Sequence, residues 1–286
     1  MANLKELRSR ITSVSSTMQI TSAMKMVSAA KLSKAQDAIT AMRPYSEKLS
    51  ELLQSLSATL DSDQSSKYAE QREVNKVLMV AISSNRGLAG AFNSNIVKAS
   101  KYVANRDYSD KSVEFYSVGK KANDILKKTF NIYKTETAIY DDLSFENAEA
   151  LAKELMALFV EGRFDRIVLV YNQFKNAATQ EVQVEQFLPI VPVEKDENVT
   201  LDYIFEPSKE EIVMELIPKS LKMQVYKALR DSFASEHGAR MTAMHKATDN
   251  AQELRDSLKL SYNKARQASI TNEILEIVGG AEALNK

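Results

Sequence analysis

The sequence predicts an α/β fold in which the N- and C-terminal helices form a long antiparallel coiled coil and carry an inserted small Rossmann-like α/β domain. Three observations predict it. Both ends of the 286-residue chain space their apolar residues alternately three and four apart, and the middle holds short, nearly continuous apolar runs. The chain has only 7 glycines and 5 prolines. Since average usage is about 7% for Gly and about 5% for Pro, breaks are rare and the elements should be long.

Residues 1–60 are predicted to form the N-terminal helix of the coiled coil. An apolar stripe with this spacing runs along one side of a helix and needs a second helix to cover it. Pro44 is expected to kink the helix, because proline removes one backbone donor. The polar residues 61–73 are predicted to be a linker. The stripe begins with Leu4, Leu7, Ile11, Val14 and Met18.

Residues 208–286 are predicted to form the C-terminal helix, which pairs with 1–60. Its apolar residues take the same alternating steps, so the two stripes can cover each other. At a rise of about 1.5 Å per residue the C-terminal helix would measure about 110 Å and the N-terminal one about 85 Å. The C-terminal stripe includes Met244, Ala247, Ala251, Leu254 and Leu258.

Residues 75–192 are predicted to form the α/β domain. Nearly continuous apolar runs are typical of strands buried on both faces, whereas strict alternation is typical of an edge strand. Strands that alternate with helices predict a small, largely parallel sheet. Strands are expected at 76–82, 113–118 and 166–171, with an edge strand at 181–187, and helices at 93–103, 120–129 and 145–160.

Composition excludes several classes of function. With 38 basic and 38 acidic residues the chain has no net charge to attract nucleic acid or anionic lipid. The absence of cysteine excludes disulfides, thiolate chemistry and cysteine zinc sites. No apolar stretch approaches the roughly 18 residues of a membrane-spanning helix, and the N-terminus lacks an apolar signal core. We therefore expect a soluble protein made and kept in the cytoplasm.

The loop at 83–93 lies where an α/β fold usually binds a ligand, and its glycines next to a helix N-terminus could cradle a phosphate. It lacks both the Lys-Ser/Thr ending of a P-loop and the three-glycine spacing of a dinucleotide site. A structural turn is therefore favoured. Arg86 is left open as a residue that contacts an interface.

The two histidines, His237 and His245, lie on the predicted C-terminal helix without an HExxH pattern or a nearby cysteine. A metal site or a Ser-His-Asp site on this helix is therefore disfavoured. The sequence predicts no catalytic residue, no cofactor and no metal. By contrast, residues 270–281 crowd Ile, Leu and Val around more than one helix face, and such an exposed apolar tip usually has a partner.

This segment, Ile-Thr-x-Glu-x-x-Glu-x-x-x-Gly-Ala at 270–281, resembles the signature of the gamma subunit of F-type ATP synthases of the bacterial type. The stretch Tyr-Asn-Lys-Ala-Arg-Gln-Ala-Ser at 262–269 is similar to the same family. So are Ile-Thr-Ser-Ala-Met-Lys-Met-Val-Ser-Ala-Ala-Lys at 20–31 and Arg-Pro-Tyr at 43–45, and the loop at 83–93 resembles that of the family's middle domain. The resemblance thus touches all three predicted segments.

The resemblance implies a central rotor stalk that couples ion-driven rotation of a membrane ring to conformational cycling of the catalytic β subunits, with no bond chemistry of its own. The implied partners are the α and β subunits of the catalytic hexamer, the epsilon subunit and the ring of c subunits. It also implies a set of residues that contact the hexamer. These are Met24, Lys25, Arg240, Arg266, Gln267, Thr271, Glu273 and Glu276.

Two further sets of residues follow from the resemblance. An apolar bearing tip would turn inside an apolar collar of the hexamer, and a foot would meet the ring of c subunits. The chain would then be a peripheral protein on the cytoplasmic face of the bacterial inner membrane, associated with the membrane only through the complex. The tip residues are Ile274, Ile277, Val278 and Ala281, and the foot residues are Tyr203, Phe205 and Glu206.

Two other classes of function remain open. A coiled-coil adaptor would bind a partner protein statically and would purify as a stable dimer or complex without ATPase subunits. A nucleotide-dependent enzyme centred on residues 83–90 would show measurable nucleotide affinity as an isolated chain. The rotor interpretation predicts neither.

Overall fold

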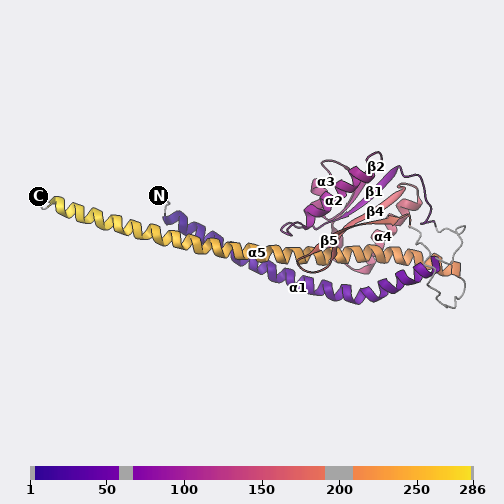
Figure 1. Ribbon diagram of the computed structural model, residues 1–286, viewed down its shortest axis with the longest axis horizontal. Coiled ribbons are helices and arrows are strands. Elements are labelled where there is room, and N and C mark those ends of the chain that lie inside the picture. Colours follow the sequence, from indigo (N-terminus) through magenta and orange to yellow (C-terminus); the bar gives the residue numbers. More distant parts are fainter. Residues whose placement is uncertain (1–3, 58–66, 191–208, 285–286) are drawn as a thin grey trace. The chain divides into compact units, whose positions relative to one another are not determined.

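The computed structural model describes residues 4–57, 67–190 and 209–284 (Figure 1). The chain divides into two compact units, Met1–Ser28 with Met241–Lys286, and Ala29–Arg240. Helices α1 (Leu4–Ser57) and α5 (Lys209–Leu284) each contribute to both units. The α/β domain lies between them in the sequence and belongs to the second unit.

In the first unit the start of α1 lies beside the second half of α5. Thr248 Oγ1 donates a hydrogen bond to Thr21 Oγ1 at 2.8 Å, and Arg255 Nη1 lies 3.6 Å from the sulfur of Met18. Residue numbers fall along α1 as they rise along α5, so the helices are antiparallel. The buried apolar residues here include Leu7, Met244 and Ala251, all members of the predicted stripes.

The second unit is built on a five-stranded sheet in the order β3-β2-β1-β4-β5. Strands β1 to β4 run parallel to one another, and β5 pairs antiparallel with β4. The central strand is buried along almost its whole length, as expected of a parallel strand covered on both faces. The strands are β1 (Lys76–Ile82), β2 (Ser112–Val118), β3 (Asn131–Glu136), β4 (Arg166–Phe174) and β5 (Gln180–Leu188).

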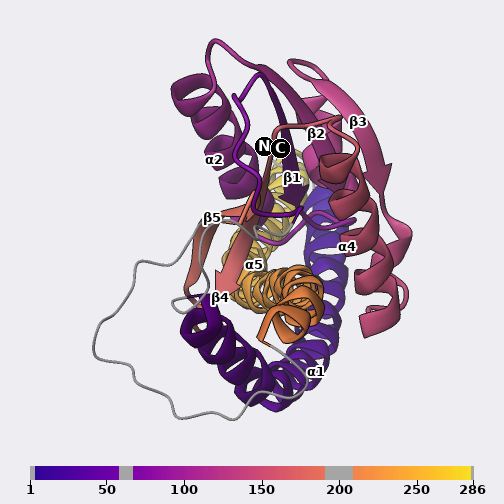
Figure 2. The same cartoon turned by 90° about the vertical axis from the view of Figure 1, so that its right-hand side faces the viewer.

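Helices cover both faces of this sheet (Figure 2). Successive side chains of a strand point to opposite faces, so β1 supplies both cores. Its residues Val77, Met79 and Ala81 pack with α2 (Phe92–Asp107) and α3 (Lys120–Leu126). Leu78, Val80 and Ile82 pack in the other core with α4 (Phe145–Val160) and with Leu221, Val225, Ala228 and Leu229 of α5. The first half of α5 is thus part of the core of the α/β domain.

Local signals fix the ends of α4. Ser144 caps its N-terminus by accepting a hydrogen bond from the Asn147 N–H at 3.3 Å. Gly162 follows the helix with a φ of 69°, and the Arg163 N–H bonds back to the Leu158 carbonyl at 3.0 Å. A residue in this left-handed conformation commonly ends a helix, and glycine adopts it without strain.

The predicted fold class is confirmed, and the predicted elements are present with ends shifted by a few residues. The sequence reading missed β3 and the short 3-10 helix η2 (Ala138–Tyr140). β3 is an edge strand with half-buried and exposed residues, so it shows no continuous apolar run. Pro44 lies inside α1, which continues to Ser57, and Pro218 lies inside α5.

Candidate functional site

The end of α5 carries large apolar side chains that nothing in the described structure covers. Every residue from 270 to 281 is exposed. An alanine Cβ at Gly279 or Gly280 would meet no atom within 4 Å. Exposed apolar patches of this kind mark binding surfaces. The exposed fractions are 47% for Ile270, 54% for Ile274, 62% for Leu275, 71% for Ile277 and 50% for Val278.

Polar residues predicted to contact the hexamer surround these apolar side chains. Thr271 Oγ1 donates to the Gln267 carbonyl at 2.9 Å, and Ser269 Oγ donates to Glu273 Oε1 at 3.3 Å. Both contacts are local to the helix, so they leave the side of α5 open to another chain. Thr271, Glu273, Glu276 and Ala281 lie on this exposed stretch, and Arg266 and Gln267, one turn before it, are exposed as well.

A second apolar surface lies on α1 in the same unit. Met24 and Lys25 are half-buried, while their neighbours Met26 and Val27 are 64% and 59% exposed. Ile20, one turn earlier, is 60% exposed. One paired helix covers only one side of α1, so these apolar side chains stay exposed beside the pairing.

Arg240 belongs to the other unit and is almost fully buried, with 6% of its surface exposed. Its Nη1 donates to Glu236 Oε1, which lies one turn earlier on α5. Its Nη2 donates to the carbonyls of Arg86 and Gly87 at 3.2 and 3.3 Å, and its Nε donates to the Gly87 carbonyl at 3.4 Å. Every nitrogen of the guanidinium group therefore has a partner within the chain.

The loop at 83–93 is closed by its own side chains. Asn93 Oδ1 accepts a hydrogen bond from the Ser84 N–H at 3.0 Å, and Ser84 Oγ donates to the Arg86 carbonyl at 2.6 Å. Leu88 and Gly90 have φ angles of 62° and 55°. The loop is thus a tight structural turn, and the Arg86 side chain is exposed.

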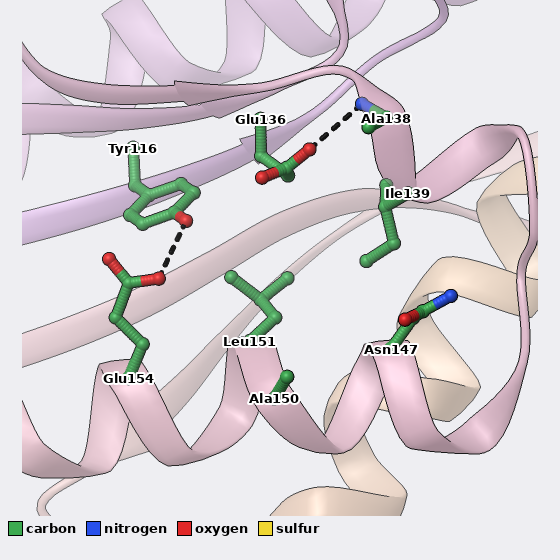
Figure 3. Close-up of a pocket in the computed structure, with 8 residues that line it drawn as sticks. All are labelled: Tyr116, Glu136, Ala138, Ile139, Asn147, Ala150, Leu151 and Glu154. Carbon is green, nitrogen blue, oxygen red and sulfur yellow. Dashed lines mark hydrogen bonds between the residues drawn. The ribbon is translucent and has the colours of Figure 1, made fainter.

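A hollow of about 280 Å³ lies between β2, the end of β3 and helix α4 (Figure 3). Tyr116 donates to Glu154 at 3.1 Å, and Lys134 forms an ion pair with the same carboxylate at 2.8 Å. Burial, with the nearby Glu154, raises the pKa of Tyr116 well above its usual value. The phenol therefore stays protonated at neutral pH and gives the hollow no general base.

The two histidines have different surroundings. His237 is buried and packs edge-on against Phe233 with ring centroids 4.5 Å apart. Burial and the nearby Arg240 and Lys31 charges lower the pKa of His237 to about 3. His245 is exposed and lies 3.3 Å from Asp249. Within the described parts of the chain, no group of three His, Cys, Asp or Glu side chains is arranged to hold a metal ion.

Asp231 is a buried carboxylate that the sequence reading missed. Burial raises its pKa to about 6, against the opposing pull of Lys227 and Arg43. Between pH 3.8 and 6 the folded state therefore binds a proton more readily than the unfolded state. The ionised form is the costly one, so its destabilising effect is largest above pH 6 and fades as the pH falls toward 4.

We therefore expect Asp231→Asn to raise the free energy of unfolding by about 1 to 3 kcal/mol at pH 8, and by progressively less below pH 6. Urea denaturation at pH 8, 6 and 4.5 measures the difference. Glu215→Gln is the control variant with the opposite expected sign. Lys219 lowers the pKa of the exposed Glu215, so loss of this carboxylate should slightly destabilise the fold at pH 8. If Asp231→Asn raised the free energy of unfolding equally at all three pH values, the buried charge would be ruled out as the source of the destabilisation.

The foot residues Tyr203, Phe205 and Glu206 lie outside the described residues. The sequence reading missed Glu236, Asp231 and the buried Asn172, although it had placed the first two on the C-terminal helix. The spacing of four between Glu236 and Arg240 was the available signal, but on most helices it marks an exposed ion pair.

Comparison with known proteins shows the relationship of the whole chain. The family model described as ATP synthase matches residues 3–284. The ATP synthase gamma chain of Christiangramia forsetii is 78% identical over 285 residues, covering 100% of both chains. That of Flavobacterium psychrophilum is 68% identical over 285 residues, covering 99% of each.

Two solved structures are also similar. The first is the central stalk and c-ring of the Tetrahymena thermophila mitochondrial ATP synthase, with a TM-score of 0.61 and 28% identity, over 80% of this chain and 99% of that chain. The second is the Euglena gracilis mitochondrial ATP synthase, OSCP/F1/c-ring, in rotational state 3. Its TM-score is 0.70 at 23% identity, over 98% of this chain and 94% of that chain, and it supports the fold alone.

Proposed function

The chain belongs to the gamma-chain family of ATP synthases, and from that premise we propose that it is the central rotor stalk of an F-type ATP synthase. It performs no bond chemistry and couples ion-driven rotation of the membrane ring to conformational cycling of the catalytic β subunits. The observation that carries this proposal is the exposed apolar end of α5 on a chain that matches the family over nearly its full length.

Coupling requires that each catalytic subunit meet a different side of the stalk. A ligand or partner shifts a conformational equilibrium only by its difference in binding free energy for the two states. A stalk whose faces differ therefore stabilises a different conformation in each β subunit, and rotation exchanges those conformations. An apolar tip in an apolar collar makes few directional bonds, so the barriers to rotation are small.

The proposed contacts follow the family resemblance. The bearing tip, Ile274, Ile277, Val278 and Ala281, turns inside the hexamer of α and β subunits. Met24 and Lys25 face the β subunits, and the foot at Tyr203, Phe205 and Glu206 meets the ring of c subunits beside the epsilon subunit. Arg266, Gln267 and Thr271 face catalytic loops, and Glu273 and Glu276 take part in coupling.

We propose three segments for this stalk, a coiled-coil helix at 1–60, an α/β domain at 75–192 and a helix at 208–286 that pairs with the first. The contacts of Thr21 with Thr248 and of Met18 with Arg255 support the pairing. No helix in the described parts of the chain is long and apolar enough to cross a membrane. We propose a peripheral location at the cytoplasmic face of the bacterial inner membrane, reached through the complex.

Assembly tests the proposal against its two rivals. Mixed with α and β subunits, the purified chain should join their hexamer as one copy per six large subunits, measured by native mass spectrometry. In calorimetry the isolated chain should bind neither ATP nor ADP. A stable homodimer that does not bind the hexamer would support the adaptor interpretation. Nucleotide binding that is abolished by Gly87→Ala or Gly90→Ala would support the enzyme interpretation.

A disulfide between α1 and α5 tests whether the paired helices turn as one. The hydroxyls of Thr21 and Thr248 lie 2.8 Å apart, within reach of a disulfide, and the chain has no cysteine of its own. We expect Thr21→Cys/Thr248→Cys to crosslink on mild oxidation and to retain most of its ATP synthesis. Thr12→Cys/Thr248→Cys is the control, since position 12 lies about 13 Å farther along α1. Activity lost on oxidation and restored by reduction would show that the helices must move apart.

A further inference from the structure

Helix α5 covers the edge of the sheet where parallel α/β folds usually bind their ligands. That site is the crevice outside the carboxyl ends of the strands. Here Ser235 Oγ donates to the Asn172 carbonyl near the end of β4 at 3.0 Å. At Gly238 an added Cβ would lie 3.2 Å from the Cα of Ala177 in the β4–β5 turn. The chain's own helix therefore fills this place with buried residues.

Arg240 is the charged residue of α5 that contacts this end of the α/β domain. A buried charge is costly unless it is paired and hydrogen bonded. The guanidinium group meets this condition with one carboxylate, Glu236, and two backbone carbonyls, those of Arg86 and Gly87. Its planar, forked donors suit several acceptors at once, which the single ammonium group of lysine cannot reproduce. The site is thus specific for a guanidinium group.

The loop at 83–93 has two sets of bonds, which share the Arg86 carbonyl as an acceptor. Its base is shaped by Ser84 and Asn93, which bond to each other and to the loop backbone. Its polar attachment to α5 is made by Arg240, which reaches the carbonyls of Arg86 and Gly87, beside an apolar contact of the loop with Ala239. Removal of Arg240 should therefore leave the Ser84 and Asn93 bonds at the base of the loop in place and loosen the hold of the helix on the loop.

We propose that Arg240 is a positioning residue which, held by Glu236, fastens the 83–93 loop to α5 so that the loop turns with the helix that the domain core already holds. This inference rests on the proposed rotor function. It gives Arg240 a task inside the chain that is separate from contact with a β subunit. The apolar core still holds the first half of α5 in the domain, so loss of the fastening lets only the loop move relative to the helix, and rotation then drives the catalytic subunits less efficiently.

The isolated full-length chain gives the first test. In Arg240→Ala we expect hydrogen exchange of the backbone amides at 86–92 to become at least about tenfold faster, which corresponds to about 1.4 kcal/mol of local stability. Millimolar methylguanidine should restore slow exchange by occupying the vacated acceptors, whereas methylammonium should not. Arg230→Ala is the matched control, because Arg230 lies on the same helix and contacts Tyr226 rather than the loop. Unchanged exchange in Arg240→Ala, or rescue by either cation equally, would overturn the proposal.

The assembled complex gives the second test, with Arg240→Gln as an alternative that fills most of the volume if the alanine variant does not fold. We expect ATP hydrolysis to persist while the ATP made per ion translocated falls about twofold or more, with recovery in methylguanidine. If the substitution only damaged the fold, ATP hydrolysis and ATP synthesis would fall together. Faster loop exchange with unchanged coupling would overturn the positioning task and leave the rotor function standing. Failure of the unaltered chain to join the hexamer would instead refute the rotor function.

Discussion

Replacement of Gly119 by alanine is expected to lower the melting temperature by roughly 6 to 12 °C, from a loss of about 3 kcal/mol. Gly119 follows β2 with a φ of 94°, where a side chain is strained. An alanine Cβ would lie 2.2 Å from the carbonyl oxygen of Ser83. The Ser83 carbonyl is a backbone group, so it cannot move away from the added Cβ without a shift of the sheet.

The surrounding hydrogen bonds explain why such a shift would spread. The Gly119 N–H donates to the Glu136 carbonyl at 2.7 Å, and the Ser83 N–H donates to the Val118 carbonyl at 2.7 Å. Ser83 Oγ accepts from the Ala122 N–H at 3.0 Å. These bonds join the ends of β1, β2 and β3 to the start of α3. Displacement of Gly119 would therefore disturb all four elements.

Thermal unfolding followed by circular dichroism measures this loss. Gly279→Ala is the control, because an alanine Cβ there meets no atom within 4 Å and the residue is helical. Alanine favours a helix over glycine by up to about 1 kcal/mol, so this variant should match or slightly exceed the parent. A Gly119→Ala protein as stable as the control would show that the backbone at this turn relaxes without cost.

The extent to which sequence predicts this fold depends on how locally each element is encoded. Strands β1 and β4 are buried on both faces, and their continuous apolar runs indicate them in isolation. The coiled-coil stripes are also visible in the sequence, and Leu7, Met244 and Ala251 are buried, but Leu254 of the predicted stripe is 52% exposed. Strand β3 lies at the sheet edge, where Asn131 and Lys134 are exposed, so its pattern depends on its neighbours. The position of β3 depends on its pairing with β2, and the sequence of β3 alone does not indicate this pairing.

The same distinction applies to the candidate site. The apolar tip could be predicted, because Ile274, Ile277 and Val278 exceed what one coiled-coil stripe needs. The burial of the Glu236–Arg240 pair could not be predicted, because the two residues have the spacing of an ordinary exposed ion pair. Their burial comes from the loop at 83–93 and the β4–β5 turn, which meet α5 only in the folded domain. The apolar character of the tip is thus encoded locally, and attachment of the domain is a tertiary property.

Deletion of residues 270–286 is expected to reduce coupled ATP synthesis about tenfold or more, equivalent to a loss of about 1.4 kcal/mol in the contact energy that separates the catalytic conformations. Residues 270–281 of this segment are exposed throughout, so its removal should leave the melting temperature of the isolated chain nearly unchanged. Any loss of function can then be assigned to lost partner contacts. Reconstitution with the hexamer and the membrane sector measures assembly and ATP synthesis separately.

A second variant separates the length of the tip from its apolar character. The triple change Ile274→Gln, Ile277→Gln and Val278→Gln keeps a good helix former at each position while it removes the apolar surface. If an apolar collar holds the tip, this full-length variant should lose coupling nearly as severely as the deletion. If the tip acts only through its length, the triple variant should couple normally. Normal assembly and coupling in both variants would mean that the exposed apolar end of α5 is not the bearing, and its partner would have to be sought outside the hexamer.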